Sequence, residues 1–419
     1  MAKKKRIILV VDDEQQKKLK KNAVDSILRK TNRTQSVRSI GANALKNLPG
    51  SVAVVQAFMK AVNWQQAQNE VLDGLNNTVV IVGQPNSGKS TLFNTLKGQN
   101  LSPVSPQAGT TKTLVRTDFG PFTLVDTPGH LPNVMESGMD QASVIVFLID
   151  GSRGLQTEDR DLYNVIKGLK KPTIIAVNKV DTLKGGESAD QFATEVAVLL
   201  GAVGVIPISG KNGTNVASEL IPSIIEASPE AALAIGRELP AFRRTAAQKI
   251  IRNSALLSLA AGLEPIPFID IPIILGTQAR LVLRLAALYG EPMDSSDARK
   301  HARELVVAMI GGLGMRYVAE QVAKLVPFGG DFVAGAIAAA STWSIGEVAL
   351  EYYEGGKQLQ PGRLQQLYLD FYHGFRKENK VQELRSELAA QNPTASIPQL
   401  TTPKEDIFPA KVLEEGNAS

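Results

Sequence analysis

A strand–loop–helix segment near residue 80 constrains the fold of this chain more than any other feature. Residues 78–82 read TVVIV, a short β-branched run typical of a buried strand, and a helical stretch follows from Thr91. Between them lies GQPNSGKS, which has the spacing G-x-x-x-x-G-K-S. A loop of this kind directs backbone N–H groups and a helix N-terminus at a phosphate. The segment therefore predicts a phosphate-binding loop at the end of a buried strand.

The polar residues of this loop have predicted roles. Lys89 would reach the β- and γ-phosphates of a nucleotide and stabilise their charge during transfer, and the Ser90 hydroxyl would ligate Mg²⁺. We expect the loop to supply these nucleotide-binding residues: Gly83, Asn86, Ser87, Gly88, Lys89, Ser90 and Thr91. The loop alone does not distinguish ATP from GTP.

From residue 78 to about residue 227, strand-like runs alternate with helical stretches. We expect strands over 78–82, 114–118, 122–126, 143–150, 172–178 and 205–209. The alternation predicts an α/β fold with a mixed, mostly parallel sheet and helices on both faces. Only a short turn separates the second strand from the third, so we expect that pair to be antiparallel. From about residue 238, Ala/Leu-rich helical stretches predict an all-α second domain.

Basic residues are concentrated at the start of the chain. The net charge is +5, but residues 1–46 contain 13 Lys or Arg and 4 Asp or Glu, which leaves −4 for the rest. Such an arm suggests an anionic membrane or nucleic acid as a partner, with a solvated tail as the alternative. Residues 15–30 predict a basic amphipathic helix, which would either lie on a membrane or pack on the second domain.

Shifts in composition divide the chain into regions. We expect a basic arm with an amphipathic helix over 1–50, a helical lead-in over 51–77, a nucleotide domain over 78–230, a helical domain over 238–380 and a polar, flexible tail over 381–419. The chain has no cysteine, which excludes disulfides and favours a reducing compartment. The apolar run at 7–11 is too short for a secretory signal, so we expect a cytoplasmic protein that is not secreted.

Four more motifs follow the loop in order. They are AGTTK at 108–112, DTPGH at 126–130, NKVD at 178–181 and SGKNG at 209–213. Together with the loop, they resemble the Era, EngA and MnmE type of the translation-factor-related GTPases. The resemblance covers residues 78–227, about a third of the chain. It implies a P-loop GTPase fold, GTP and GDP as ligands, and Mg²⁺ as the cofactor.

The acidic residue of NKVD predicts guanine specificity. Asp181 can accept both N1–H and the exocyclic amine of guanine in a bidentate, charge-assisted pair. Adenine lacks this arrangement, and each lost hydrogen bond to a charged group costs about 1.5–3 kcal/mol. By the resemblance, Asn178 ties this motif to the phosphate loop and Lys179 stacks its stem on the base.

The last motif is expected to complete the guanine site. The resemblance implies that Ser209, Gly210 and Lys211 offer groups to the guanine O6. The family more often has Ala where this chain has Gly210, a change that leaves the backbone donor intact.

The resemblance also assigns the residues around the γ-phosphate. Asp126 would hold Mg²⁺ through water, and Thr111 would ligate Mg²⁺ when the γ-phosphate is present, with Thr110 as the alternative if the register shifts by one. The Gly129 N–H would sense the γ-phosphate. His130 would either position the attacking water or act as a mobile switch residue.

A monovalent cation is a further expectation from this family type. Asn86 would help ligate K⁺ beside the β- and γ-phosphates, where positive charge stabilises the leaving group. The alternative is that Asn86 only forms hydrogen bonds within the loop.

The region 243–377 resembles the helical, YcjF-like domain of unknown function that follows Era-type GTPase domains in some bacterial proteins. The resemblance rests on NSALLSLAAGLEPIPFIDIPIILGTQARL and on GGDFVAGAIAAASTWSIGEVALEYYEGG. A membrane-spanning helix needs about 20 apolar residues. The uncharged run Phe332–Gly346 has only 15. We therefore favour a buried helix pair in a bundle over a hairpin that dips into one leaflet.

Three roles stay open on the sequence alone. We favour a GTP-driven switch that associates peripherally with an anionic membrane surface and acts on a protein effector. The second role is an RNA or ribosome-assembly GTPase, because residues 311–314 read GGLG, the spacing of a KH loop, although without a cation. The third is a GTP-binding scaffold with negligible hydrolysis. The oligomeric state is not predicted.

Overall fold

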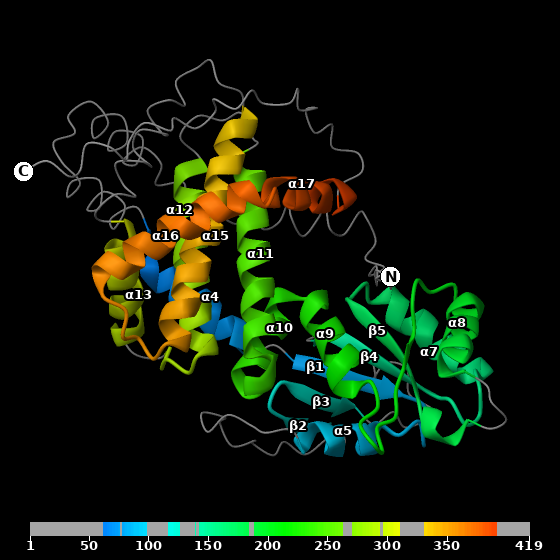
Figure 1. Ribbon diagram of the computed structural model, residues 1–419. Coiled ribbons are helices and arrows are strands. Elements are labelled where there is room, and N and C mark those ends of the chain that lie inside the picture. Colours follow the sequence, from blue (N-terminus) through cyan, green and yellow to red (C-terminus); the bar gives the residue numbers. More distant parts are fainter. Residues whose placement is uncertain are drawn as a thin grey trace, which may run out of the picture.

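The computed structural model describes residues 62–75, 78–98, 116–125, 139, 142–183, 188–262, 270–293, 296–310 and 331–391. These residues form an α/β part and a helical part that lie side by side (Figure 1). The predicted basic arm and its amphipathic helix lie outside the described residues, and so do the GGLG segment and residues 392–419.

The α/β part is built on a six-stranded sheet with the strand order β2-β3-β1-β4-β5-β6. The strands are β1 (Thr78–Gly83), β2 (Arg116–Phe119), β3 (Phe122–Val125), β4 (Ala142–Asp150), β5 (Thr173–Asn178) and β6 (Ile206–Pro207). The pair β2 and β3 is antiparallel and the other neighbouring pairs are parallel. The predicted fold class and the predicted antiparallel pair are confirmed.

Side chains alternate between the two faces of this sheet, because successive residues of a strand point in opposite directions. On one face Val80, Phe147 and Val177 share a buried cluster with residues of α7 (Thr157–Gly168) and α8 (Ala189–Leu200). On the other face, Val79 and its neighbours pack with α5 (Lys89–Lys97) and α9 (Ile221–Ala227). Two helical layers therefore cover the sheet and leave its strand ends open for loops.

Within the described residues, the helical part contains six further helices. They are α11 (Arg243–Ala261), α12 (Asp270–Leu288), α13 (Ser296–Ile310), α15 (Asp331–Glu354), α16 (Pro361–Lys377) and α17 (Lys380–Gln391). Helix α11 packs against α12 and α15, and α15 packs against α16. Among the described helices, none combines the length and the apolar character needed to cross a bilayer. The predicted all-α character of this part is confirmed.

Helix α4 (Trp64–Leu75) precedes the sheet in the chain but packs on the helical part, against α12, α13 and α10 (Pro229–Glu238). The Gln68 side chain donates to the backbone carbonyl of Met293, and Glu70 pairs with Arg280 at 3.1 Å. The lead-in was predicted to be helical, but its packing partner was not predicted. The chain therefore enters the α/β part from a helix of the bundle and returns to the bundle after it.

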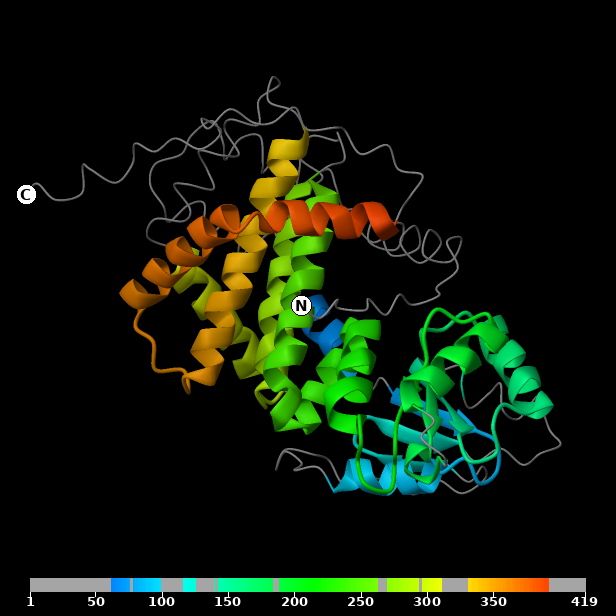
Figure 2. The ribbon, with the colours of Figure 1, turned by 45° about the vertical axis from the view of Figure 1, so that its right-hand side comes forward.

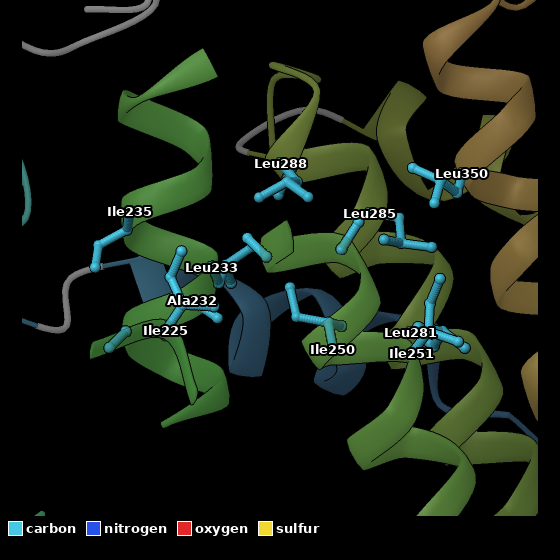
Figure 3. Packing of buried hydrophobic residues seen from close by; sticks show 14 of the residues in the cluster. Ile225, Ala232, Leu233, Ile235, Ile250, Ile251, Leu281, Leu285, Leu288 and Leu350 are labelled. Carbon is cyan, nitrogen blue, oxygen red and sulfur yellow. The ribbon is translucent and has the colours of Figure 1, made fainter. Parts of the chain in front are cut away.

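Helix α10 (Pro229–Glu238) joins the two parts through a shared core. Its residues from Ala231 to Gly236 are all buried. In Figure 3, Leu233 of α10 points toward Ile250 of α11 and Leu288 of α12. A Cβ on Gly236 would lie 2.5 Å from Cβ of Ala246 and 2.6 Å from Cδ1 of Leu288, so only glycine permits this close approach. The sheet and the bundle therefore share one continuous apolar cluster.

The expectation of a flexible tail from residue 381 is wrong for its first turns. Helix α17 crosses the bundle and packs on α11 and α16 (Figures 1 and 2). Val381, Leu384 and Leu388 recur at helical spacing and pack on the core, with Leu384 buried. The Lys380 ammonium lies 5.6 Å from the centre of the Trp343 ring. The segment from residue 381 is polar overall, so its composition did not reveal this narrow apolar stripe.

Candidate nucleotide-binding site

The predicted phosphate loop lies between β1 and α5, as the sequence implied. Strand β1 ends at Gly83 and helix α5 begins at Lys89. Asn86 and Gly88 both have positive φ, 66° and 88°, so the loop turns sharply before the helix. A Cβ on Gly88 would lie 2.2 Å from Nδ2 of Asn178, which explains why only glycine fits at this position.

The Lys89 side chain folds back into the curve of the loop. Its Nζ donates to the carbonyl of Gly83 at 2.9 Å and to that of Gln84 at 3.1 Å, and the residue is 5% exposed. The cation is therefore held inside the loop by two of its backbone carbonyls. This arrangement places positive charge where a phosphate would be bound.

Hydroxyl groups occupy two different environments in this loop. Ser87 is fully buried, and its Oγ has no hydrogen-bond partner among the described residues. Ser90 and Thr91 lie exposed in the first turn of α5, and Asn86 is exposed in the loop. The exposed groups are the ones that can reach a ligand or a metal ion without rearrangement.

Asn178 connects the phosphate loop to the last predicted motif. The residue ends β5 and is 1% exposed. Its Nδ2 donates to the Ser87 carbonyl at 2.9 Å, and its Oδ1 accepts the Gly210 N–H at 2.7 Å. The tie between Asn178 and the phosphate loop is present as expected. One buried amide thus holds together three segments that lie far apart in the sequence.

Gly210 does not present a free backbone donor, contrary to the expectation. Its N–H is already donated to Asn178, so an interaction with guanine O6 would have to share this group. A Cβ on Gly210 would lie 3.0 Å from the backbone nitrogen of Leu92, and Thr95 donates its hydroxyl to the Gly210 carbonyl. Glycine therefore lets this loop lie tightly on helix α5, a contact that sequence comparison with the Ala of other members could not show.

Asp181 is held at the edge of the site by Ser209. Asp181 lies exposed in a short 3₁₀ turn (Val180–Thr182), and its Oδ1 accepts the Ser209 hydroxyl at 2.6 Å. Ser209 itself is fully buried, whereas Lys211 is exposed. The second carboxylate oxygen of Asp181 points away from this bond and can accept donors from a ligand.

Lys179 forms an ion pair that sequence reasoning did not find. Its Nζ lies 2.7 Å from Oδ2 of Asp150, the last residue of β4. Oδ1 of Asp150 accepts the Ser152 hydroxyl at 2.6 Å and the Ser152 N–H at 3.0 Å. Burial raises the pKa of Asp150, but the hydrogen bonds from Lys179 and Ser152 outweigh burial, so its pKa lies below the ordinary value. The signal that could have drawn attention to Asp150 is its place at the end of the strand predicted over 143–150.

The segment after Asp150 also reaches the phosphate loop. Gln84 donates its amide to the carbonyl of Glu158 at 2.9 Å. Glu158 and Asp159 lie in the first turn of α7, and Asp159 caps this helix by accepting the Gln156 N–H at 3.1 Å. Burial raises the pKa of Asp159. The turn between β4 and α7 therefore braces both the base-recognition motif and the phosphate loop.

The predicted residues of the second and third motifs lie outside the described residues. These residues are Thr110, Thr111, Asp126, Gly129 and His130. Strand β3 ends at Val125, directly before the third motif. Within the described ranges, no group of three His, Asp or Glu side chains forms a metal site. The other residues of the expected Mg²⁺ site, Thr111 and Asp126, are among those outside the described residues.

Two family models match separate parts of the chain. Residues 78–179 match the 50S ribosome-binding GTPases, and residues 227–392 match a domain of unknown function, DUF697. Helix α4 lies outside both matched segments, although it packs on the helical part.

Curated relatives match the α/β part. GTPase Der of Thermoanaerobacter pseudethanolicus is 35% identical over 167 residues, which is 36% of this chain and 37% of that protein. GTPase Era of Aquifex aeolicus is 33% identical over 171 residues, 36% of this chain and 56% of that protein. A crystal structure of Era with MgGDPNP and a segment of 16S ribosomal RNA is 29% identical, covers 43% of this chain and 66% of that chain, and has a TM-score of 0.29. The matched segment thus spans less than two thirds of the relatives.

Proposed function

We propose that this chain, which combines a GTPase domain of the 50S ribosome-binding GTPase family with a DUF697 domain, binds GTP and hydrolyses it to GDP and phosphate. The proposal rests on the site at the carboxyl ends of β1, β5 and β6, where the loops expected to hold phosphate and guanine converge. The named relatives Der and Era are both GTPases, and the segment that matches the family model includes the phosphate loop and the first two residues of NKVD.

The single observation that carries the proposal is the bridging position of Asn178. Its amide joins the Ser87 carbonyl of the phosphate loop to the Gly210 N–H of the last motif. A nucleotide has its phosphates and base at opposite ends, so a site for it needs these two loops at a fixed separation. A buried side chain with both ends bonded supplies that separation.

Guanine selectivity follows from Asp181. Its carboxylate is oriented by Ser209 and exposed on one side, which leaves oxygen lone pairs for N1–H and N2–H₂ of guanine. Adenine would leave these lone pairs unsatisfied. Replacing Asp181 with Asn should weaken GTP binding and admit xanthosine nucleotides, whose N1/C2 edge matches an amide.

Hydrolysis would use Mg²⁺ and the predicted switch residues. Ser90 lies exposed at the start of α5, where it can ligate Mg²⁺ together with Thr111 and with Asp126 through water. The Gly129 N–H would contact the γ-phosphate, and His130 would position water. The exposed Asn86 can join a K⁺ site, a role tested by comparing hydrolysis in KCl and NaCl at equal ionic strength.

We further propose that the protein acts as a nucleotide-dependent switch at a membrane surface. Two features support this role besides the +9 charge of residues 1–46. First, the adjoining stretches 254–262, 273–279 and 335–346 contain no charged residue. Second, these stretches meet in one bundle, where Ser258 and Thr342 hydroxyls lie 2.8 Å apart and Gln278 donates to Thr342 at 3.2 Å. Uncharged stretches in the bundle of a chain that begins with a basic arm suit an anionic lipid surface.

An RNA-directed role has weaker support. The Era structure above contains a segment of ribosomal RNA, but the matched segments of Der and Era cover only the α/β part of this chain. A KH domain clamps the RNA backbone with its GXXG loop, whereas the GGLG of this chain contains no cation and no strand lies near it in the sequence among the described residues. Here the described segments that flank residues 311–314 are the helices α13 and α15.

The deciding experiment measures nucleotide binding and phosphate release by the full chain. GTP should bind with Mg²⁺ and resist competition by ATP, and Lys89→Ala should abolish binding. Lys167→Ala, at an exposed position on α7, is the matched control and should leave binding unchanged. Equal competition by ATP would contradict guanine specificity, and binding without phosphate release would favour the scaffold role.

The partner question needs a separate measurement at matched salt. The full chain and a variant without residues 1–46 should be sedimented with anionic liposomes and tested for RNA binding. We expect liposome binding that weakens on deletion, because each cation near an anionic surface contributes about 1 kcal/mol. Undiminished liposome binding by the deletion variant would assign the membrane contact to the uncharged stretches of the bundle. RNA binding without liposome binding would contradict the membrane role.

A further inference from the structure

We propose that Asp150 is a positioning residue for guanine-nucleotide binding, which acts by holding the Lys179 ammonium so that the lysine stem lies across the base site. The inference rests on the proposed function, because it concerns the same site. Asp150 belongs to none of the motifs singled out in the sequence, and it is 7% exposed.

The two oxygens of the Asp150 carboxylate accept hydrogen bonds from different residues. Oδ1 is occupied by the hydroxyl and N–H of Ser152, at 2.6 and 3.0 Å. This leaves Oδ2 aimed at Nζ of Lys179, 2.7 Å away. A carboxylate locked on one side has one direction left for its second oxygen, so the position of the ammonium is determined by the turn.

The backbone reinforces the same alignment. Asp150 and Asn178 are register partners on β4 and β5, and the Gly151 N–H donates to the Asn178 carbonyl at 2.8 Å. A Cβ on Gly151 would lie 2.7 Å from that carbonyl oxygen, so the two turns can approach this closely only with glycine there. The turn that carries Asp150 is thus joined directly to the turn that carries Lys179.

The lysine stem passes from this anchor toward the phosphate loop. Lys179 has φ of 66°, and its Cε lies 3.8 Å from the position of a Cβ on Gly88. The stem therefore extends from Asp150 over the end of the phosphate loop, where a bound nucleoside would lie. Without the anchor, the four-carbon chain would sample many rotamers, and binding would have to restrict them.

The sign of the effect separates this role from simple electrostatics. Removing a carboxylate near a bound polyphosphate should strengthen binding by Coulomb's law alone. Loss of positioning should weaken it. The full chain is therefore compared with Asp150→Asn, with Lys179→Met and with the double variant, by titrating a fluorescent GDP analogue and by GTP turnover.

We expect Asp150→Asn to weaken GDP and GTP binding about tenfold, at the low end for a charge-assisted hydrogen bond because Lys179 is partly exposed. Turnover at saturating GTP should change less than about twofold, since the anchor lies on the base side. In the Lys179→Met background, Asp150→Asn should have less than about a twofold effect on binding. Asp161→Asn removes a charge from an exposed position on α7 and should not weaken binding.

Three outcomes would overturn the inference: Asp150→Asn binding as tightly as wild type or more tightly, effects of Asp150→Asn and Lys179→Met that multiply, or a fall in turnover without a change in affinity. If Asp150→Asn does not fold, Ser152→Ala loosens the same carboxylate and keeps its charge. That variant should weaken binding about threefold, and only when Lys179 is present. Wild-type protein that binds no guanine nucleotide would instead contradict the proposed function.

Discussion

The two faces of the sheet are built from similar side chains but have different neighbours. One face, with Val80 and Phe147, is closed by α7 and α8, and Phe147 stacks on Tyr163 with ring centres 6.1 Å apart. The opposite face, with Val79 and Ile81, continues through α9 and α10 into the helical bundle. The first layer ends within the α/β part, whereas the second has no boundary at residue 227, where the DUF697 match begins.

This difference teaches that a sequence boundary need not be a mechanical one. Each nucleotide loop follows a strand whose side chains enter both layers, so the site rests on both. Helix α4 strengthens the connection, because it packs on the bundle and leads into β1 across residues 76 and 77. The bundle is therefore part of the support of the phosphate loop and not an independent neighbour.

The largest expected effect comes from a cavity in the shared layer. Ile250→Ala in α11 removes a fully buried side chain and should lower the free energy of unfolding by about 2–5 kcal/mol. Because the layer is continuous, unfolding followed by Trp64 and Trp343 should coincide with release of a fluorescent GDP analogue. Ile166→Ala in α7 is the matched change in the other layer.

Two separated transitions in Ile250→Ala would break the comparison, because they would show that the bundle unfolds on its own. A denaturant titration with both signals recorded on the same sample decides between these outcomes.

The next effect concerns the side-chain amide of Asn178, which joins the phosphate loop to the last motif. Asn178→Ala leaves the buried Ser87 carbonyl and Gly210 N–H without this partner, which costs about 1–3 kcal/mol for each group. We expect a lower free energy of unfolding and at least a tenfold loss of GTP affinity. Asn94→Ala, at an exposed position on α5, should change neither quantity. Unchanged affinity in Asn178→Ala would show that the loops hold their separation by other contacts.

A smaller effect is expected at two ion pairs of helix α12, one with α4 and one with α10. Arg280 pairs with Glu70 of α4 at 3.1 Å, and one turn later Arg284 pairs with Glu230 of α10 at 3.6 Å. These pairs are partly exposed, so Arg280→Ala and Arg284→Ala should each cost about 0.2–1 kcal/mol. The loss should shrink in high salt, as measured by denaturant midpoints.

Arg363→Ala serves as the control for these arginines, because Arg363 is exposed and hydrogen-bonds only to Gln366 of its own helix among the described residues. Salt-independent losses at Arg280 and Arg284 would assign them a packing role in place of a charge role.

The smallest effect is a pH-dependent stabilisation within the bundle. Burial raises the pKa of Glu347 on α15, although the hydrogen bonds from Gln248 act against it. The folded state therefore holds this proton more tightly, and the stability from Glu347 is full below the unfolded pKa and lost as the pH rises through the folded pKa. Glu347→Gln should be more stable than wild type at neutral pH, and the advantage should vanish in acid. Glu383→Gln, exposed on α17, should show no such pH dependence.

A large part of the site was predictable because its chemistry is local. The loop from Gly83 to Lys89 needs a strand before it, a helix after it and Asn or Gly where φ is positive, and all three are visible in consecutive residues. The antiparallel direction of β2 and β3 also followed from the sequence, because only a short turn separates these two strands.

Other features depended on residues that are distant in sequence. Nothing near Asp150 indicates that Lys179 lies beside it, because the contact arises from the pairing of β4 with β5. The use of the Gly210 N–H by Asn178 arises in the same way. These partners share no sequence spacing, so no motif records them.

The sequence by itself determined the α/β class, the phosphate loop, the guanine motif and the helical character of the second part, because each depends on periodicity or on neighbouring residues. Only the tertiary structure decided that α4 belongs to the bundle, that α17 continues it and that one apolar layer joins sheet to helices. A pattern of apolar side chains predicts that they are buried, but it does not predict which surface covers them. The choice among apolar surfaces is made by shape, as where Gly236 lets α10 approach α11 and α12.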